Sequence, residues 1–402
     1  MLYYWLKYMM QFALTVFYRK RIFTGWDQVP ATGPVIFACN HPNSFLDAMI
    51  IGAFIRRETY FLARSDVFNS PLKLWILSQF KLMPIYRLSE GKEDLGKNKD
   101  TFEKCHAIFR KGGAVLMFSE GLCVQEMRLR SLKKGTARIA MEYSKDGAPL
   151  TIIPTGLNYL NPMSFREDIL IQMDTPFNAA DFAAEYNENN SKGIQSFNKR
   201  LVSGFHNAVI DIRDKQNEKA IQQLVEIEYN NGGDLKKLIE IVKPSYSNDD
   251  LALLSGYRSA LEKNGVRDEA VAGKKSNALL AIPATLIFGL AFWLYLLPVA
   301  PVMNLVKKKI RLVEFKDSVL IGGVVVLTFV YWMIVFIAVW MSVNLQIATA
   351  ALLFLVLIAA LAGPSYDVMR NVRNQNLASK KDDLRRLRAR VSVIASSVLH
   401  LV

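Results

Sequence analysis

The stretch FACNHPNSFLD, Phe37–Asp47, decides the fold. It begins in an apolar run typical of a buried strand, and Asn43 or Ser44 can cap a helix that carries Asp47. His41 therefore lies where a strand turns into a helix, and a carboxylate follows on that helix. This is the layout of a general base and of the acid that orients its imidazole. A histidine that only caps a polar turn is the structural alternative.

Short apolar strands and helices alternate on both sides of this stretch. Strands are predicted at 59–63, 83–87, 114–118 and 150–157, and helices at 45–55, 71–80, 101–111 and 132–143. Such alternation is typical of an α/β fold with a largely parallel sheet flanked by helices. Functional groups in such sheets gather at the carboxyl ends of the strands, where His41, Arg87 and Glu120 are all expected.

Composition favours a membrane-associated chain over a nucleic-acid-binding one. Of the 402 residues, 51% are hydrophobic, and the formal net charge is +14. Basic residues cluster beside apolar stretches, which favours an anionic membrane surface or a phosphate-bearing substrate, and we expect no nucleic-acid partner. Cys39, Cys105 and Cys123 include no Cys-x-x-Cys pair and are interpreted as reduced thiols facing a cytosol. The histidines lack metal-ligand spacing, so no metal is expected.

Five regions are predicted along the chain. An N-terminal membrane-associated helix at 1–22 is favoured, with an ordinary amphipathic helix packed on the domain as the alternative. The α/β domain follows at 23–215 and a helical extension at 216–273. The membrane region is predicted at 274–366, and a basic cytoplasmic tail at 367–402.

The membrane region contains three apolar runs. Val319–Met341 and Val343–Gly363 are each long enough to span a bilayer. The run 277–306 is flanked by lysines on both sides, and basic residues prefer the cytosol. Pro298 and Pro301 interrupt this run, so we expect a broken helical hairpin, with a single straight span as the alternative. The chain is thus expected to be an integral protein of a plasma or inner membrane, with a cytoplasmic catalytic domain.

Three further motifs suit a phosphate-bearing polyol. Glu120 follows a strand and can accept hydrogen bonds from a hydroxyl, and Gly121 lets the backbone approach a ligand. Arg87 can bind phosphate bidentately. Arg130 and Lys133 belong to a basic loop that enters a helix, which suits a phosphate or an acyl-carrier surface. Each motif also has an ordinary explanation, as a solvated glutamate, a surface arginine or a solvated charge run.

In their order along the chain, these motifs resemble the glycerolipid acyltransferase family. Asn-His…Asp, Pro-Ile-Tyr-Arg, Phe-x-Glu-Gly, Lys-Lys-Gly and Ile-Ile-Pro follow one another between residues 40 and 154. The family includes the lysophosphatidate and glycerol-3-phosphate acyltransferases, and the resemblance covers residues 20–215. It implies a membrane enzyme of phospholipid synthesis. Such an enzyme moves a fatty acyl group from acyl-CoA or acyl-carrier protein to a hydroxyl of glycerol 3-phosphate or 1-acylglycerol 3-phosphate, without a further cofactor.

The resemblance also implies roles for single residues. His41 would be the general base and Asp47 its partner. The other matching positions are implied to bind substrate. Arg87 would bind the phosphate, Glu120 and Gly121 the acceptor, and Pro154 would lie on the acyl-donor side. With their neighbours, the substrate-binding set is Arg87, Glu120, Gly121, Ser119, Asn40, Arg130, Lys133 and Pro154.

Two departures from the family pattern concern the site. The family usually has four residues between its His and Asp, whereas five lie between His41 and Asp47. Because a helix turns about 100° per residue, the extra residue must be absorbed in the turn before the helix. The family usually has Pro before the Glu and a polar pair after the Gly, whereas this chain has Ser119 before and Leu122-Cys123 after. The second departure bears on the acceptor more than on the reaction class.

Other functions fit the same residues. A lipid hydrolase would use the His–Asp pair with water as the acceptor, although no Gly-x-Ser-x-Gly elbow occurs. A non-catalytic membrane scaffold would be expected to have lost His41, Asp47 or Glu120, and all three are present. Acyl transfer to another lipid acceptor is a further alternative.

Overall fold

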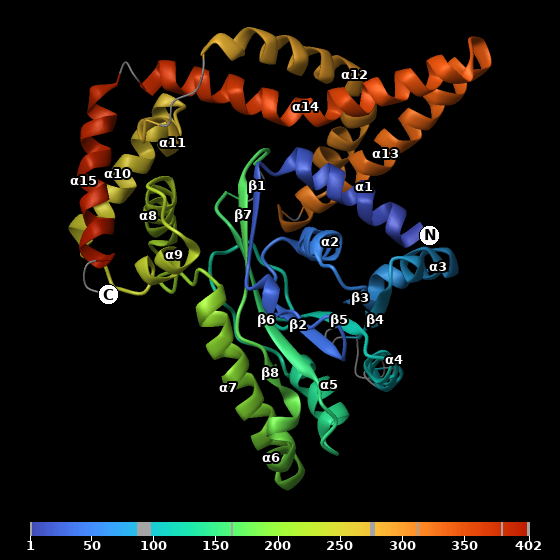
Figure 1. Ribbon diagram of the computed structural model, residues 1–402. Helices are drawn as coiled ribbons and strands as arrows, with labels where there is room; N and C mark the ends of the chain where they lie inside the picture. Colours follow the sequence, from blue (N-terminus) through green and yellow to red (C-terminus); the bar gives the residue numbers. More distant parts are fainter. Residues whose placement is uncertain are drawn as a thin grey trace. The chain divides into compact units, whose positions relative to one another are not determined.

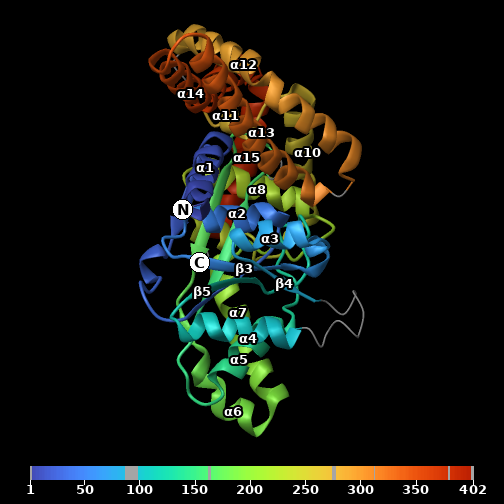
Figure 2. The same cartoon turned by 90° about the vertical axis from the view of Figure 1, so that its right-hand side faces the viewer.

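The chain forms two compact units in the computed structural model (Figures 1 and 2). The described residues are 2–86, 98–161, 164–273, 278–311, 313–378 and 381–399. Unit 1 comprises Met1–Gln11, Ile22–Asn158 and Leu170–Val209. Unit 2 comprises Phe12–Arg21, Tyr159–Ile169 and Ile210–Val402. The division falls within the first helix, α1 (Leu2–Phe17), and each unit is described by itself.

A largely parallel sheet organises unit 1, as the sequence predicts. Among the described residues it has eight strands in the order β1-β7-β6-β2-β5-β3-β4, with β8 paired to β6. β2 runs parallel to β5 and β6, β3 runs parallel to β4 and β5, and β8 is antiparallel to β6. The strands are β1 (Lys20–Thr24), β2 (Val35–Cys39), β3 (Thr59–Arg64), β4 (Leu82–Ile85), β5 (Ala114–Phe118), β6 (Thr151–Tyr159), β7 (Asp168–Met173) and β8 (Phe177–Asn178).

Helices cover both faces of this sheet (Figure 2). One face presents Ile36, Val115 and Ile152 to an apolar cluster that includes Phe109 and Phe197 from two covering helices. β2 is buried along its whole length because it lies between β5 and β6, so the residue after it emerges at the centre of the carboxyl edge. The helices of this unit are α2 (Ser44–Phe54), α3 (Pro71–Gln79), α4 (Asn98–Arg110), α5 (Lys134–Ser144), α6 (Ala183–Glu188) and α7 (Asn190–Ala208), with short 3-10 turns η1 (Trp26–Gln28), η2 (Ser65–Phe68) and η5 (Ala179–Phe182).

The first part of α1 packs on unit 1. Lys7 and Gln11 donate hydrogen bonds to backbone carbonyls at the end of α2. Tyr4, Trp5 and Tyr8 remain exposed. The helix therefore packs on the domain and still presents aromatic side chains of the kind found at membrane interfaces. Its contact with a membrane stays a prediction.

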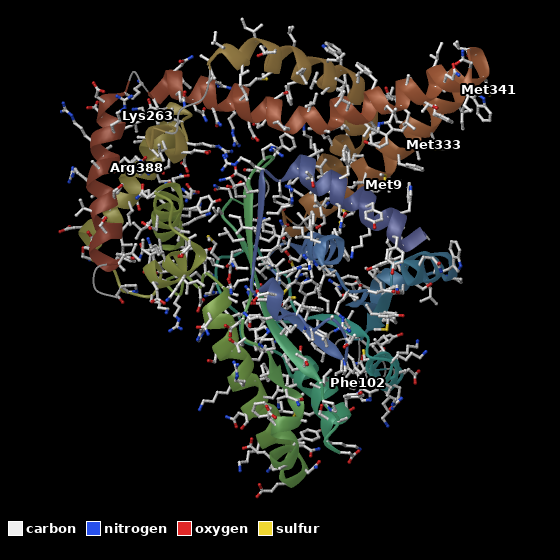
Figure 3. All side chains as sticks on the ribbon, in the orientation of Figure 1. Met9, Phe102, Lys263, Met333, Met341 and Arg388 are labelled. Carbon is white, nitrogen blue, oxygen red and sulfur yellow. The ribbon has the colours of Figure 1, made fainter. Side chains whose placement is uncertain are left out.

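Unit 2 is helical beyond the short segments it takes from the first half of the chain. Three of its described helices are long and apolar enough to cross a membrane, over Ala278–Lys309, Ser318–Ser342 and Leu345–Ala378. Met333 and Met341 lie exposed on the second of these (Figure 3). The helices are α8 (Glu218–Asn230), α9 (Leu235–Ile241), α10 (Asn248–Asn264), α11 (Asp268–Val271), α12 (Ala281–Lys309), α13 (Val313–Ser342), α14 (Leu345–Ala378) and α15 (Asp382–Leu399), with a 3-10 turn η6 (Ala278–Leu280).

The prediction of a broken helical hairpin over 277–306 is wrong. In the structure α12 is one continuous helix. Pro298 and Pro301 lie inside it. Before the prolines, the Tyr295 hydroxyl donates to a backbone carbonyl of α14, and after them Val302 packs against α13. Proline removes one helical N–H and bends a helix, and neighbouring helices can shield the freed carbonyl. The prolines thus lie within a helix that continues past them and does not reverse.

The predicted basic tail, 367–402, is also folded. α14 continues through Ala378, and α15 packs against α8, α9, α10 and α11. Leu384, Val391 and Ala395 form the buried face of α15, while most of its arginines point outward. The segment therefore combines a basic composition with the apolar stripe of an amphipathic helix.

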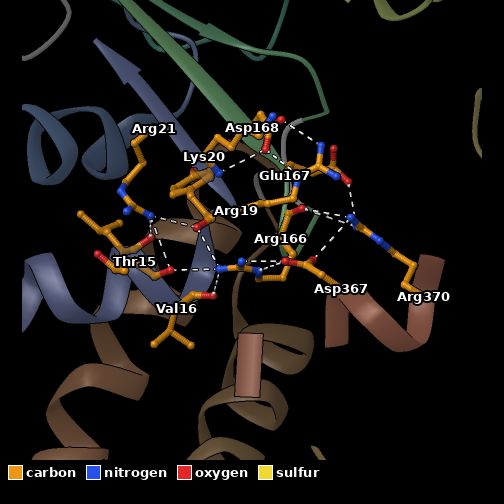
Figure 4. A network of polar contacts seen from close by, with 12 residues as sticks. Thr15, Val16, Arg19, Lys20, Arg21, Arg166, Glu167, Asp168, Asp367 and Arg370 are labelled. Carbon is orange, nitrogen blue, oxygen red and sulfur yellow. Dashed lines mark hydrogen bonds and ion pairs between the residues drawn. The ribbon is translucent and has the colours of Figure 1, made fainter. Parts of the chain in front are cut away.

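Arg166 holds three segments of unit 2 together (Figure 4). It is only 6% exposed, and its guanidinium donates to Asp367 Oδ2 on α14 at 2.9 and 2.6 Å. It also donates to the carbonyl oxygens of Thr15, Val16 and Tyr18 at the end of α1, at 3.0, 3.1 and 3.0 Å. A buried charge is tolerated only when it is paired and hydrogen-bonded in this way.

Candidate active site

His41 directly follows β2 and contacts the predicted carboxylate. Its Nδ1 lies 2.9 Å from Oδ2 of Asp47, in the first turn of α2. The same oxygen accepts the backbone N–H of Asn43 at 2.8 Å, and Asp47 is fully buried. Because a carboxylate accepts, this hydrogen bond requires the histidine proton on Nδ1. The other ring nitrogen, Nε2, is then free to act as a base.

The His41 ring is also held from one side. It stacks on the ring of Phe118, with centroids 3.7 Å apart and planes 12° from parallel. Phe118 ends β5 and pairs in register with Cys39, the last residue of β2, so the two rings meet because the two strands are parallel neighbours. The side chain of His41 is 12% exposed. Stacking and the Asp47 hydrogen bond together restrict the imidazole to one orientation.

Ser44 accommodates the long spacing between His41 and Asp47. Its φ is 51°, in the left-handed region that residues other than glycine rarely adopt. Its backbone N–H donates to Sγ of Cys123 at 2.9 Å. This unusual conformation lies in the turn where the extra residue was expected, and it lets the His41–Asp47 contact form despite the departure from the family spacing.

Glu120 braces the loop that carries His41. It is 5% exposed, and its Oε2 accepts the backbone N–H of His41 at 3.0 Å. Its Oε1 accepts the backbone N–H of Arg130 at 2.9 Å. Burial raises the pKa of Glu120, and the two backbone donors oppose that rise. Both carboxylate oxygens therefore accept hydrogen bonds from the protein backbone, and the role in holding the acceptor that the resemblance implies stays a prediction.

Asn40, Ser119 and Pro154, three of the predicted substrate-binding residues, contact other parts of the fold. The Asn40 amide exchanges two hydrogen bonds with the backbone of Leu157 on β6, at 3.1 and 2.7 Å. Ser119 Oγ lies 3.0 Å from the hydroxyl oxygen of Thr136, and both are buried. Pro154 lies inside β6 and is buried. Asn40 and Ser119 thus tie neighbouring segments together near His41, and the substrate-binding roles of all three residues stay predictions.

The basic loop before α5 presents the remaining described candidates. Gly121 has a φ of 70°, and a Cβ there would lie 2.8 Å from Cγ of Lys133, so the turn requires glycine. Arg128 and Arg130 pair with Glu126 at 2.9 and 3.3 Å. Burial acts to raise the pKa of Glu126, but hydrogen bonds from the two arginines lower it below its usual value. Lys133 is exposed just before the N-terminus of α5. The loop is thus a cationic surface, only partly neutralised.

Arg87, the predicted phosphate contact, lies outside the described residues. Within the described part of the chain, no group of three or more His, Cys, Asp or Glu side chains could hold a metal ion. Sequence reasoning missed Phe118 and Cys123, although both flank the Ser119-Glu120-Gly121 motif. The position of Phe118 and Cys123 beside the motif could have pointed to them. Neither a phenyl ring nor a thiol, however, has a characteristic sequence distance from a catalytic histidine.

Comparisons with known proteins match the region that contains this site. Residues 20–158 match the family described as Acyltransferase. The match includes His41, Asp47 and Glu120, and it ends before α7.

Two curated relatives match this chain over part of their length. The chain is 28% identical over 141 residues to 1-acyl-sn-glycerol-3-phosphate acyltransferase LPAT1, chloroplastic, of Arabidopsis thaliana, covering 35% of this chain and 37% of that one. It is 26% identical over 141 residues to 1-acyl-sn-glycerol-3-phosphate acyltransferase CHLREDRAFT_174358 of Chlamydomonas reinhardtii, covering 35% and 40%. The chain therefore spans less than half the length of these relatives.

A solved structure is also similar. The 1-acyl-sn-glycerophosphate acyltransferase PlsC of Thermotoga maritima has 20% sequence identity and a TM-score of 0.36, covering 50% of this chain and 79% of that one.

Proposed function

We propose that this chain transfers a fatty acyl group from a thioester donor to the free hydroxyl of 1-acylglycerol 3-phosphate. The observation that carries the proposal is the hydrogen bond between His41 and Asp47 at the carboxyl end of the central strand. The names of the curated relatives favour this acceptor over glycerol 3-phosphate. Acyl-CoA and acyl-carrier protein are both compatible donors, and each would act as a co-substrate.

In the proposed reaction, His41 moves a proton and the acceptor oxygen forms the new bond. Nε2 of His41 takes the proton of the acceptor hydroxyl as its oxygen attacks the thioester carbonyl carbon. Asp47 stabilises the imidazolium through the Nδ1 hydrogen bond. The tetrahedral intermediate then expels the thiolate as the C–S bond breaks, and the imidazolium returns its proton to that sulfur. The products are the ester and the free thiol, and no covalent enzyme intermediate is needed.

The basic loop is the proposed contact for the acceptor phosphate. Arg128 and Arg130 lie on the loop that Glu120 ties to His41, so a phosphate there would be held at a fixed distance from the base. Lys133 adds an exposed cation. Arginine suits this task because its planar guanidinium can donate two hydrogen bonds to one phosphate. Arg87 remains a proposed second contact on the basis of its sequence motif alone.

The proposed substrate is a lipid, and three helices suit a membrane location. They are long and apolar enough to cross a bilayer, and large apolar side chains such as Leu353 and Ile334 are exposed on them. Membrane association would keep the enzyme where its acceptor and product reside. A cytoplasmic position for the acyltransferase domain is part of the proposal, since both candidate donors are cytosolic thioesters.

The test is an assay of full-length protein in lipid nanodiscs with radiolabelled acyl-CoA or acyl-carrier protein. We expect labelled phosphatidate from 1-acylglycerol 3-phosphate, and its loss in His41→Ala, because removing a general base costs about 10²–10⁴-fold. His206→Ala, a partly exposed histidine on α7, is the matched control and should retain activity. Release of free fatty acid without phosphatidate would identify a hydrolase. Label in neither product would contradict catalysis.

A further inference from the structure

Unit 2 contains a polar cavity apart from the acyltransferase site. Its volume is about 320 Å³, and all of its lining residues belong to unit 2. The walls come from Arg19, the 160–168 segment, α8, the end of α10 and α11. Among the described lining residues, carboxylates outnumber guanidinium groups two to one. The carboxylates are Glu167, Asp168, Glu226, Glu262, Asp268 and Glu269, and the guanidinium groups are Arg19, Arg258 and Arg267.

One wall is a network centred on Arg19 (Figure 4). Arg19 grips Asp168 with Nε and Nη2 at 2.9 and 2.8 Å, and its Nη1 donates to Glu269 at 2.6 Å. The Tyr229 hydroxyl donates to the same aspartate at 2.6 Å. Each of the three nitrogens of the Arg19 guanidinium therefore already donates to a carboxylate.

The other charged lining groups are paired in the same way. Asp268 accepts hydrogen bonds from the Arg388 guanidinium of α15 at 2.9 Å and from the Tyr257 hydroxyl at 2.6 Å. Arg388 is labelled in Figure 3. Glu262 pairs with Arg258 at 3.1 Å, and Glu167 pairs with Arg267. These contacts satisfy five of the six carboxylates with cations.

Glu226 is the exception. In the described part of the chain it forms no salt bridge, and the amide of Gln223, 3.3 Å away, is a neutral donor. Burial raises the pKa of Glu226 to about 7, with a hydrogen bond from Asn161 and the charge of Arg258 acting against that rise. A carboxylate that lines a cavity without a salt bridge is stabilised in its charged form by any cation that enters.

We propose that this cavity binds the protonated amine of a small ligand, with Glu226 as its counter-ion. Glu226, the one described lining carboxylate without a salt bridge, favours a cationic ligand, and the arginines of the lining are already paired with carboxylates. Neutral oxygens of Asn161 and Gln223, which also line the cavity, can accept further N–H groups of an ammonium. A metal ion fits less well, because no described group of His, Cys, Asp or Glu has metal-ligand geometry.

The cavity lies where the apolar helices of unit 2 become polar. Asp268 and Glu269 are on α11, and exposed Leu279 and Leu280 follow at the start of the α12 span. Glu167 lies 3.6 Å from Arg370 of α14, beyond the last exposed leucine of that helix, Leu361. Lipid headgroups lie at such boundaries. The amine can therefore come from a free small molecule or from an amine-bearing headgroup, and the experiment must distinguish the two.

The test measures ethanolamine binding to the detergent-purified full chain by calorimetry. We expect saturable binding, and no binding of ethylene glycol, which replaces the amine with a hydroxyl. Glu226→Gln should weaken binding by about tenfold or more, because it removes a charged hydrogen-bond acceptor. Glu240→Gln on α9, a glutamate paired with Lys243 and outside the cavity, is the matched control and should bind as wild type does.

Lipid competition identifies the source of the amine. Displacement of ethanolamine by phosphatidylethanolamine, but not by phosphatidylcholine, would assign the site to a headgroup, whereas no displacement would assign it to a free amine. Asn161→Leu fills the cavity without removing a carboxylate and should also abolish binding, which covers the case of a poorly folded Glu226→Gln. Equal binding by wild type and both cavity variants, or no saturable binding by wild type, would overturn the proposal.

Discussion

Replacing Glu120 with glutamine separates a bracing role from an acceptor-binding role. The wild-type carboxylate accepts one backbone N–H on each oxygen, from His41 and from Arg130. Glutamine keeps one carbonyl oxygen and turns an NH₂ group toward the other N–H. One charge-assisted hydrogen bond is lost, which contributes roughly 1.5–3 kcal/mol, and a buried donor is left unpaired. The loop of His41 or the basic loop must move to relieve this.

Such movement affects the reaction more than the binding of the acceptor. A displacement of His41 of about 1 Å lowers the rate on the order of 10²-fold. We therefore expect Glu120→Gln to lower kcat by about 10²-fold, with the KM for 1-acylglycerol 3-phosphate changed by less than about threefold. Initial rates at varied acceptor concentration would measure both constants, and thermal unfolding would report the loss of stability. Glu142→Gln, an exposed glutamate on α5, is the control. A large rise in acceptor KM at unchanged kcat would refute the bracing role.

Three further outcomes are expected. Asp47→Asn should lower kcat by about 10³–10⁴-fold with unchanged thermal unfolding, because the amide no longer holds the His41 proton on Nδ1; a nearly silent variant would assign that task elsewhere. Asp367→Asn should lower the unfolding free energy of unit 2 by about 3–5 kcal/mol, because it leaves the buried Arg166 charge unpaired. Denaturant titration would measure this loss, and a loss below about 1 kcal/mol would contradict the prediction. Glu226 has its pKa raised from 4.5 to about 7 by burial, so its contribution to stability is complete below pH 4.5 and is lost as pH rises through about 7. Thermal unfolding across that window should therefore show a decline that Glu226→Gln removes, and an identical decline in the variant would argue against it.

The sheet and the contact between His41 and Asp47 could be predicted from the sequence because both depend on local patterns. Alternating apolar strands and helices indicate a parallel sheet, and such a sheet places the residue after its central strand at the carboxyl edge. His41 and Asp47 are close in sequence, so one turn suffices to bring them together. The role of Glu120 could not be predicted in this way. Its partners are backbone N–H groups, which every residue has, so no residue type marks them.

The C-terminal third shows a second limit. Prolines in the α12 region suggested a break, but whether a proline breaks or bends a helix depends on the neighbours that cover it. Those neighbours are α13 and α14, which follow later in the chain. Similarly, the cavity around Glu226 collects residues from positions 19 to 269, and no sequence window contains them together.

The partnership of Arg166 with Asp367 has a consequence for biosynthesis. The two residues are 201 positions apart, so the segments that carry Arg166 and α1 are synthesised well before its carboxylate. At a translation rate of roughly 5–20 residues per second, the interval is on the order of 10–40 s. During that time the guanidinium has only neutral oxygens as partners among its contacts in unit 2. The strands of the α/β sheet are therefore synthesised early and can fold early. The charge of Arg166 in unit 2 is compensated only after α14 has been synthesised.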